Sequence, residues 1–429
     1  MKNLLRILMT VALATVAFAC HANAQATGSS GSSGAQADVE KIQSRVDGVD
    51  AQVQVIQTDL DKLKKIKVSG YIQARYDVSE TSHDAKVSGS PAAIKNANLS
   101  RIYIRRGRLK VTYDSSPLSQ AVIYFDGGTS GTDQAAATPK NLNSLGLVRL
   151  LEAYVTLRDP WTPDHRHSIN MGQMNIPFGY EIERSSSVRE LPERSKAENV
   201  LFPGERDRMI TLTDQWTPQL QTVIGVLNGT GINNTDLPTT TYRAGKDFLA
   251  RARWSQGIFD VAASAYVGKN KIPLTYDGGK GFTHDKTRYG ADAQYYYSLP
   301  TVGGGSLKAE FYTGHEVNPD SVKALTGSLA LNAGKDVHHL ATDFVGYYGM
   351  MVQNLGEQLQ FAARYDHFDP NTNKDHDQYS RVGLGFNYFY DSNIRVTLAY
   401  DIPTTDVKTN GTYTDPKDNL WTLQLQHKF

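Results

Sequence analysis

The stretch R-V-G-L-G-F-N-Y-F-Y-D-S-N-I-R-V-T-L-A-Y-D, residues 381–401, alternates on both sides of a short turn. Before the turn at 391–393, one face carries Val382, Leu384, Phe386, Tyr388 and Tyr390. The opposite face carries Arg381, Gly383, Gly385 and Asn387, and the alternation resumes after the turn from Ile394 to Asp401. A period of two residues is that of a β-strand, so the stretch predicts an antiparallel hairpin.

Similar segments recur from residue 67 to residue 429, separated by turn residues. In 71–78, Ile72, Ala74, Tyr76 and Val78 lie opposite Tyr71, Gln73, Arg75 and Asp77. We count about sixteen such segments, each taking about 23 residues with its connection, a spacing typical of membrane strands joined by alternating turns and loops. The chain is rich in Tyr (23) and Gly (36), which suits strands and tight turns.

Bulk composition excludes two classes of protein. With 45 basic and 44 acidic residues, the net charge of +1 argues against a nucleic-acid binder. A mean hydropathy of −0.43 with 21% charged residues excludes a bundle of membrane helices.

The N-terminus has the features of a secretory signal peptide, residues 1–24. Lys2 and Arg6 precede an apolar stretch at 7–19, and a small-residue cleavage site ends at Ala24. Cleavage there removes Cys20, the single cysteine, and leaves a mature chain without disulfides. Lipoprotein processing at Cys20 is the alternative.

Residues 25–37 have the composition of a flexible Gly/Ser linker. Residues 38–66 change character and carry a heptad seam of Val39, Ile42, Val46, Val49, Val53, Ile56, Leu60 and Leu63. This spacing predicts a coiled-coil helix, and β-branched residues at the d positions favour three strands over two. The alternative is a single amphipathic helix lying on its own barrel.

The polar face of the strands identifies the architecture. It carries Arg, Gln, Asn, Asp and Gly on successive strands, which suits a water-filled lumen, and aromatic residues gather near segment ends as in membrane girdles. The stretch L-W-T-L-Q-L-Q-H-K-F, 420–429, alternates to its end. Because no backbone group can stay unpaired in hydrocarbon, we expect this strand to close the barrel on the first one. The predicted fold is all-β, a sixteen-stranded antiparallel transmembrane β-barrel.

Three stretches resemble one family. M-G-Q-M-N-I-P-F-G-Y-E (171–181), L-E-A-Y-V (151–155) and F-P-G-E-R-D-R-M-I (202–210) are similar, in order and spacing, to stretches of phosphate-selective porins of the O and P type. The resemblance covers 67–429. It implies a homotrimeric porin in the outer membrane of a Gram-negative bacterium, with the coiled coil in the periplasm. Phe429 resembles the C-terminal signal that the barrel-assembly machinery reads.

A long polar stretch at about 177–208 has few strand signals. The resemblance implies that this loop folds inward and narrows the lumen. It carries basic side chains, Arg184, Arg206 and Arg208 among them, but slightly more acidic ones. Its composition therefore does not establish anion selectivity, because a constriction selects by the charge that it presents.

The expected pore-lining and anion-binding residues combine this loop with the wall of the barrel. They are Arg75, Arg106, Arg108, Lys110, Arg184, Arg206, Arg208, Arg251, Arg253, Arg364 and Arg381. Stacked guanidiniums would bind oxyanions in bidentate fashion. Alternatively, they pair with lumen carboxylates such as Asp77, Glu152 and Asp366. A lysine cluster, expected at the narrowest point of a phosphate-selective channel, is not visible.

The sequence thus predicts a passive channel for small anions, phosphate or polyphosphate. The alternatives are a general, weakly selective porin and a structural tether between outer membrane and periplasm. No nucleophile motif accompanies the histidines, and His165 and His167 lack a metal-ligand framework, so we expect no enzyme and no cofactor.

Overall fold

The computed structural model describes residues 32–80, 99–128, 148–232, 245–272, 282–317, 341–409, 412–415 and 418–429. The predicted signal peptide, 1–24, lies outside these residues. The chain divides into two compact units, Met1–Ile66 and Lys67–Phe429, which are described separately.

The N-terminal unit contains one long helix, α2 (Ser32–Leu63). The helix therefore includes residues 32–37, which the sequence had assigned to the linker. Ala and Gln in this stretch are good helix formers and extend the helix. The helix also ends before the predicted boundary at residue 66. Its seam is exposed at Val39, Ile42, Val49, Ile56, Leu60 and Leu63. None of the described helices has the length and hydropathy that a membrane crossing requires.

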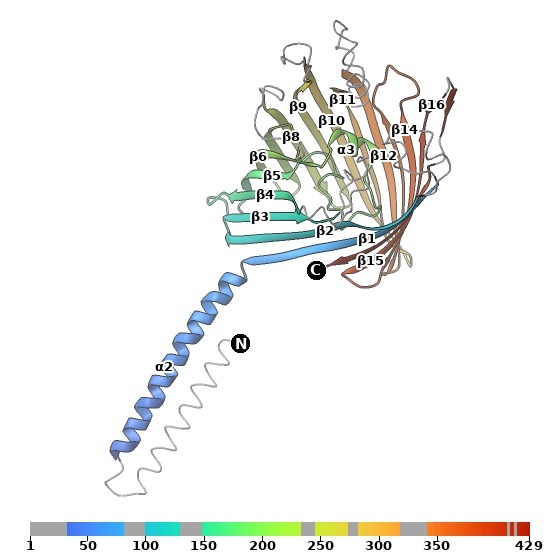
Figure 1. The fold of residues 1–429 in the computed structure, drawn as a ribbon. Helices are drawn as coiled ribbons and strands as arrows, with labels where there is room; N and C mark the ends of the chain where they lie inside the picture. The colour runs from blue at the N-terminus through green and yellow to red at the C-terminus, as the bar shows by residue number, and fades with distance from the viewer. Residues whose placement is uncertain are drawn as a thin grey trace. The chain divides into compact units, whose positions relative to one another are not determined.

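The second unit is a closed antiparallel barrel of sixteen strands within the described residues (Figure 1), as the alternation predicted. Its first eight strands are β1 (Ile66–Ser79), β2 (Leu99–Ser116), β3 (Ser119–Asp126), β4 (Arg149–Arg158), β5 (His167–Asn175), β6 (Arg206–Gln215), β7 (Leu220–Leu227) and β8 (Asp247–Gln256). The others are β9 (Phe259–Ile272), β10 (Phe282–Leu299), β11 (Gly303–Val317), β12 (Ala341–Leu355), β13 (Leu359–Asp369), β14 (Tyr379–Phe389), β15 (Ile394–Thr405) and β18 (Leu420–Lys428). β16 (Val407–Thr409) and β17 (Thr412–Thr414) form a separate small hairpin.

The barrel closes between its first and last strands. β1 pairs with β18 from Tyr71↔Lys428 to Ser79↔Leu420. Beyond this register, Gly70 and Phe429 exchange two backbone hydrogen bonds of 2.9 and 3.0 Å. Inside the seam, Gln73 Nε2 donates to Gln426 Oε1 at 2.7 Å. The expected closing role of the last strand is confirmed.

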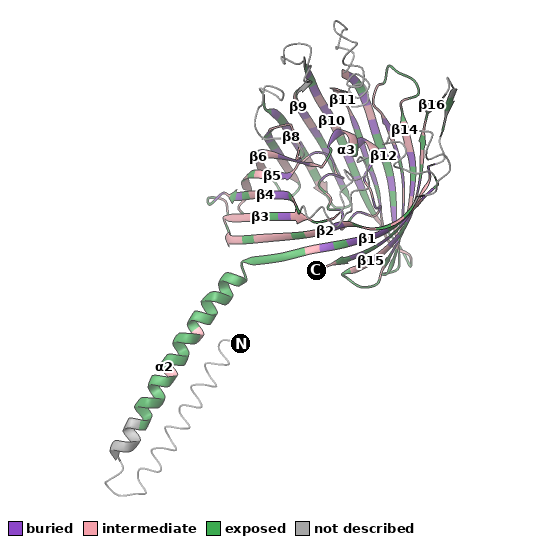
Figure 2. Ribbon diagram, in the orientation of Figure 1, coloured by how far each residue is buried: buried purple, intermediate pink, exposed green. Residues whose placement is uncertain are grey.

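Along most strands buried and exposed positions alternate (Figure 2), and many of the buried positions are polar whereas the exposed ones are largely apolar. In β18, Thr422, Gln424 and Gln426 are buried, whereas Trp421 and Leu425 are exposed. The hairpin predicted at 381–401 is formed by β14 and β15, with Phe386 outside. Large apolar side chains that stay exposed on one face suit a surface surrounded by lipid.

The inner face is not polar all round, contrary to the simplest expectation. A buried apolar cluster lies inside the barrel and includes Met209 of β6, Leu249 of β8, Tyr312 of β11, Phe344 of β12 and Phe368 of β13. These strand residues are covered by a segment that enters the lumen. The core of this protein therefore sits within the barrel, on one side of it.

Candidate channel lumen and constriction

The segment between β5 and β6, residues 176–205, is the structural element that enters the lumen. It contains a short helix, α3 (Lys196–Leu201), which contacts β12 and β13 and lies among the strands in Figure 1. Ser195 caps this helix by accepting a hydrogen bond from the backbone of Glu198. β6 begins at Arg206, so the predicted loop of 177–208 ends too late, and Arg206 and Arg208 belong to a strand.

Apolar side chains attach this inward segment to the wall. Phe178 and Ile182 are fully buried, and Phe202 is nearly so. The ring of Phe178 lies 4.9 Å from that of Phe202 and 6.2 Å from that of Tyr312, centroid to centroid. Burying several such side chains stabilises the attachment by about 1.5–3 kcal/mol each. The segment is thus held as a packed layer.

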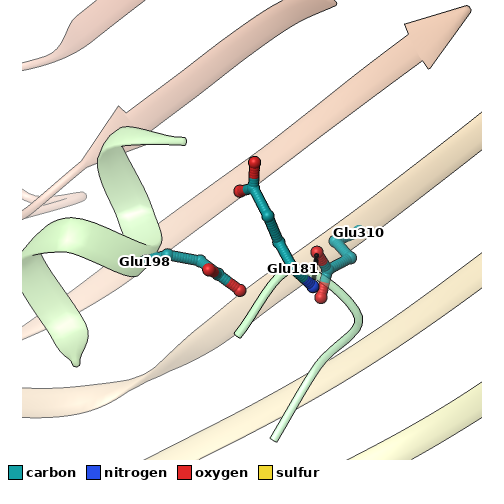
Figure 3. Close-up of side chains that lie close together, drawn as sticks. All are labelled: Glu181, Glu198 and Glu310. Atoms are coloured by element: carbon teal, nitrogen blue, oxygen red, sulfur yellow. Dashed lines mark hydrogen bonds between the residues drawn. The ribbon is translucent and has the colours of Figure 1, made fainter. Parts of the chain in front are cut away.

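A trio of buried carboxylates adds a polar attachment (Figure 3). Glu181 and Glu198 of the segment meet Glu310 of β11, with ligand oxygens within 4.8 Å of one another. Glu181 accepts from Arg364 Nη1 at 2.7 Å, and the hydroxyl groups of Tyr312 and Tyr348 donate to Glu198 and Glu310.

The charge of the trio is partly balanced within the protein. Burial, followed by the charges of Glu310 and Glu181, raises the pKa of Glu198 well above its usual value. Three carboxylates at this separation have the oxygen ligands that a divalent cation uses. Arg194 Nε, however, lies 3.4 Å from Glu198 Oε2 and supplies positive charge there.

Glu193 joins the segment to the opposite side of the barrel. Its carboxylate oxygens lie 2.7 Å from Arg75 Nη1, 2.9 Å from Arg105 Nε and 3.4 Å from Arg106 Nη2. Burial opposes its ionisation, but the guanidiniums of Arg105, Arg106 and Arg75 outweigh it and hold the pKa of Glu193 well below its usual value. One carboxylate is therefore shared by three of the basic groups that line the wall.

Most of the remaining wall arginines are also paired. Arg251 Nη1 lies 2.7 Å from Asp292, Arg253 contacts Asp260, and Arg364 contacts Glu181. Arg381 Nη2 lies 2.8 Å from Asp366. These arginines are thus held in ion pairs with carboxylates of other strands or of the inward segment, as in the alternative interpretation of the sequence.

A cavity of about 650 Å³ lies beside the inward segment. Its charged lining is strongly biased: six basic side chains face two acidic ones, Glu152 and Glu183. The basic residues are Arg108, Lys110, Arg184, Arg194, Arg206 and Lys428. Tyr71, Tyr124 and the serines at 185–187 complete the polar surface.

The exposure of these basic groups differs. Arg206 lies 2.9 Å from Glu152, and Arg108 lies 2.9 Å from Asp126, both with little exposed surface. The side chains of Lys110 and Arg184 remain 34% and 39% exposed, and their nearest carboxylates lie at 3.6 and 3.9 Å. Arg208 is not among the lining residues, and its Nη1 donates to the carbonyl of Gly231. Lys110 and Arg184 are therefore the most accessible cations of the candidate residues here.

Sequence reasoning missed several charged residues of the lumen. Lys286 lies 2.7 Å from Asp247, Arg288 lies 2.6 Å from Glu316, and Lys308 lies 2.5 Å from Glu190. Lys286 and Arg288 share one parity in β10, so the alternation itself contains the signal that places them inside. Glu193 and Arg189, which lie in the inward segment, belong to no periodic pattern.

Comparisons with known proteins agree with this architecture. Residues 352–429 match the family described as phosphate-selective porin O and P. No curated protein matches the chain. The outer membrane channel DcaP of Acinetobacter baumannii is similar in structure, with 14% identity, a TM-score of 0.57 and coverage of 85% of this chain and 97% of that chain.

Two further solved structures are similar. The anion-selective porin from Comamonas acidovorans has 11% identity and a TM-score of 0.54, covering 85% of this chain and 99% of that chain. OmpT of Vibrio cholerae, described as an outer membrane protein in its trimer form, has 12% identity and a TM-score of 0.50, with coverage of 85% and 99%. At these identities the likeness establishes a shared porin fold.

Proposed function

We propose that this protein is an outer-membrane channel through which small anions diffuse passively. The observation that carries the proposal is the lining of the 650 Å³ cavity, where six basic side chains face two acidic ones. Basic side chains in a narrow space attract anions, because the low-dielectric wall screens their charge poorly. The match of residues 352–429 to phosphate-selective porins and the likeness to an anion-selective porin support the same class.

Within that class we propose phosphate and polyphosphate as solutes. The partly exposed cations Lys110 and Arg184 lie on the same cavity as Ser185, Ser186 and Ser187, whose hydroxyl groups can donate to phosphate oxygens. Guanidinium and ammonium groups are the usual protein partners of phosphate.

A general, weakly selective porin is the second candidate. It is favoured by the ion pairs of Arg251, Arg364 and Arg381, because a guanidinium already bound to a carboxylate attracts a passing anion weakly. The selectivity of the whole pore depends on whether the basic cavity or these neutral pairs control the narrowest part of the path.

We further propose that the chain works as a homotrimer in the outer membrane of a Gram-negative bacterium. In the seam of α2, Ile42, Val49 and Ile56 are 47%, 45% and 58% exposed. Such an exposed apolar seam suits a periplasmic coiled coil that binds two other copies. The tether role then accompanies transport.

The test is the conductance of the purified protein in a planar bilayer under a KCl gradient, with phosphate then added. We expect stepwise channels, a reversal potential of anionic sign and partial block by phosphate. Steps with little ion preference and no block would favour the general porin. Folded protein without channels would leave only the tether.

A further inference from the structure

Arg189, in the inward segment, is buried without a hydrogen bond from its side chain to any described residue. Only 4% of the residue is exposed, yet among the described residues none of its three guanidinium nitrogens has a hydrogen-bond partner. Burial, reinforced by the charge of Arg194 and only partly offset by the charges of Glu193 and Glu181, lowers the pKa of Arg189 to about 9. Burying a charged donor group is unfavourable unless an acceptor or an opposite charge compensates it, so this side chain points to a ligand.

A small cavity of about 10 Å³ lies against Arg189. Arg184 and Arg364 also line it, and the Nε atoms of both lack a hydrogen-bond acceptor within the described part of the chain. Arg364 Nε does lie 3.3 Å from Asp366. The space is that of about one water-sized particle. It is too small for phosphate, which has five heavy atoms.

The side chains that line the cavity carry a net positive charge. Two carboxylates line it, Glu181 and Glu190, but each already has a close cation: Arg364 at 2.7 Å and Lys308 at 2.5 Å. Arg184 Nη2 lies 3.9 Å from Glu190 Oε1, a long ion-pair distance. The rest of the wall includes the apolar side chains of Leu191 and Met350. A water molecule is neutral, whereas a monatomic anion both accepts hydrogen bonds from the guanidinium groups and balances the excess positive charge.

We propose that this cavity binds a single halide ion, chloride under physiological conditions, held by the guanidiniums of Arg189 and Arg184. The ion would join the turn at 184–191 to β12 and β13, which supply Met350 and Arg364, and so fix the inward segment on the wall. The site shares Arg184 with the 650 Å³ cavity but is much smaller, and it serves the structure of the constriction. It does not depend on which solute the channel conducts.

Bromide provides the direct test, because it replaces chloride and scatters anomalously. Crystals of the full-length protein grown in sodium bromide should give an anomalous peak within hydrogen-bonding distance of the guanidinium of Arg189. Bromide peaks confined to the protein surface, or a water molecule at Arg189 in such crystals, would overturn the proposal.

Thermal unfolding in detergent gives a second readout. The wild-type midpoint should rise with chloride or bromide, saturate, and stay unchanged in gluconate of equal ionic strength, since gluconate cannot enter the cavity. Arg189→Met should remove this halide dependence. Arg166→Gln is the matched control, since Arg166 is exposed and pairs with Asp164, and it should retain the dependence.

Equal wild-type midpoints in chloride and gluconate would contradict the proposal. If Arg189→Met does not fold, the wild-type salt comparison and the bromide crystals still decide.

Discussion

Lys110→Gln offers the sharpest test of the basic cavity. Lys110 lies on β2, its side chain is 34% exposed, and the nearest carboxylate, Glu152, is 3.6 Å away. It lines the cavity together with five other basic residues. Replacing it removes one positive charge from the lining and leaves the pair of Arg206 and Glu152 in place.

The size of the effect follows from Coulomb's law. For an ion passing about 5 Å from the ammonium group, in a medium of effective dielectric about 60, one unit charge contributes about 1 kcal/mol. Since 1.4 kcal/mol corresponds to a factor of ten, the permeability of chloride should fall about five-fold and that of potassium should rise about five-fold, so that their ratio falls about 25-fold. Salt at 0.1 M screens little over this distance, because the Debye length is about 10 Å.

The assay is the reversal potential of single channels in a planar bilayer under a KCl gradient. Lys269→Gln is the control, because Lys269 is exposed and pairs only with the exposed Asp285 among the described residues. We expect the control to match the wild type. A reversal potential of Lys110→Gln that also matches the wild type would refute the view that this cavity determines selectivity.

Three further predictions concern the inward segment and the helix. Phe178→Ala removes a fully buried ring and should destabilise the packed segment by about 3–5 kcal/mol. The loosened segment should give larger and noisier conductance steps, whereas Phe386→Ala on the outer face should leave the steps unchanged. Glu193→Gln frees Arg75, Arg105 and Arg106 from their shared carboxylate, so anion preference should rise in the reversal-potential assay; a fall would contradict the charge assignment. Deletion of 25–66 should weaken trimers in crosslinking but preserve channels, and loss of all channels would count against the porin.

The pH dependence of the Glu193 contact has a defined sign. Because its folded-state pKa lies well below the usual value, the contact stabilises the segment above the ordinary pKa of a glutamate and is lost only as the pH falls through the depressed one. Below the ordinary pKa of a glutamate, the unfolding midpoint of the wild type should therefore fall with pH more steeply than that of Glu193→Gln, which has no carboxylate to protonate at this position.

Much of the fold follows from the sequence because the relevant rule is local. Successive side chains of a strand point to opposite faces, so the runs around Arg75, Arg364 and Arg381 already place these residues in the lumen. The same rule makes the stretch 420–429 a strand, and the requirement for paired backbone in lipid makes it pair with β1.

The candidate site could be predicted only in part. Alternation places Lys110 and Arg108 on the inner wall but does not say whether a carboxylate lies beside them. The inward segment has no period, so nothing in its sequence alone shows that Phe178 packs inside the barrel or that Glu193 reaches Arg75. Composition also did not predict that the helix begins at Ser32, because Ala and Gln within a Gly/Ser stretch extended the helix.

The sequence by itself determined which face is polar in the strands that alternate, that there are about sixteen strands, and that the barrel closes. The tertiary structure alone decided which charges are neutralised and which remain accessible. The physical reason is that a face is set by backbone geometry within one strand, whereas an ion pair such as that of Arg364 with Glu181 depends on the path of a segment far away in the chain. The partial exposure of Lys110, and the lack of a hydrogen bond between the guanidinium of Arg189 and any described residue, become visible only when those paths are known.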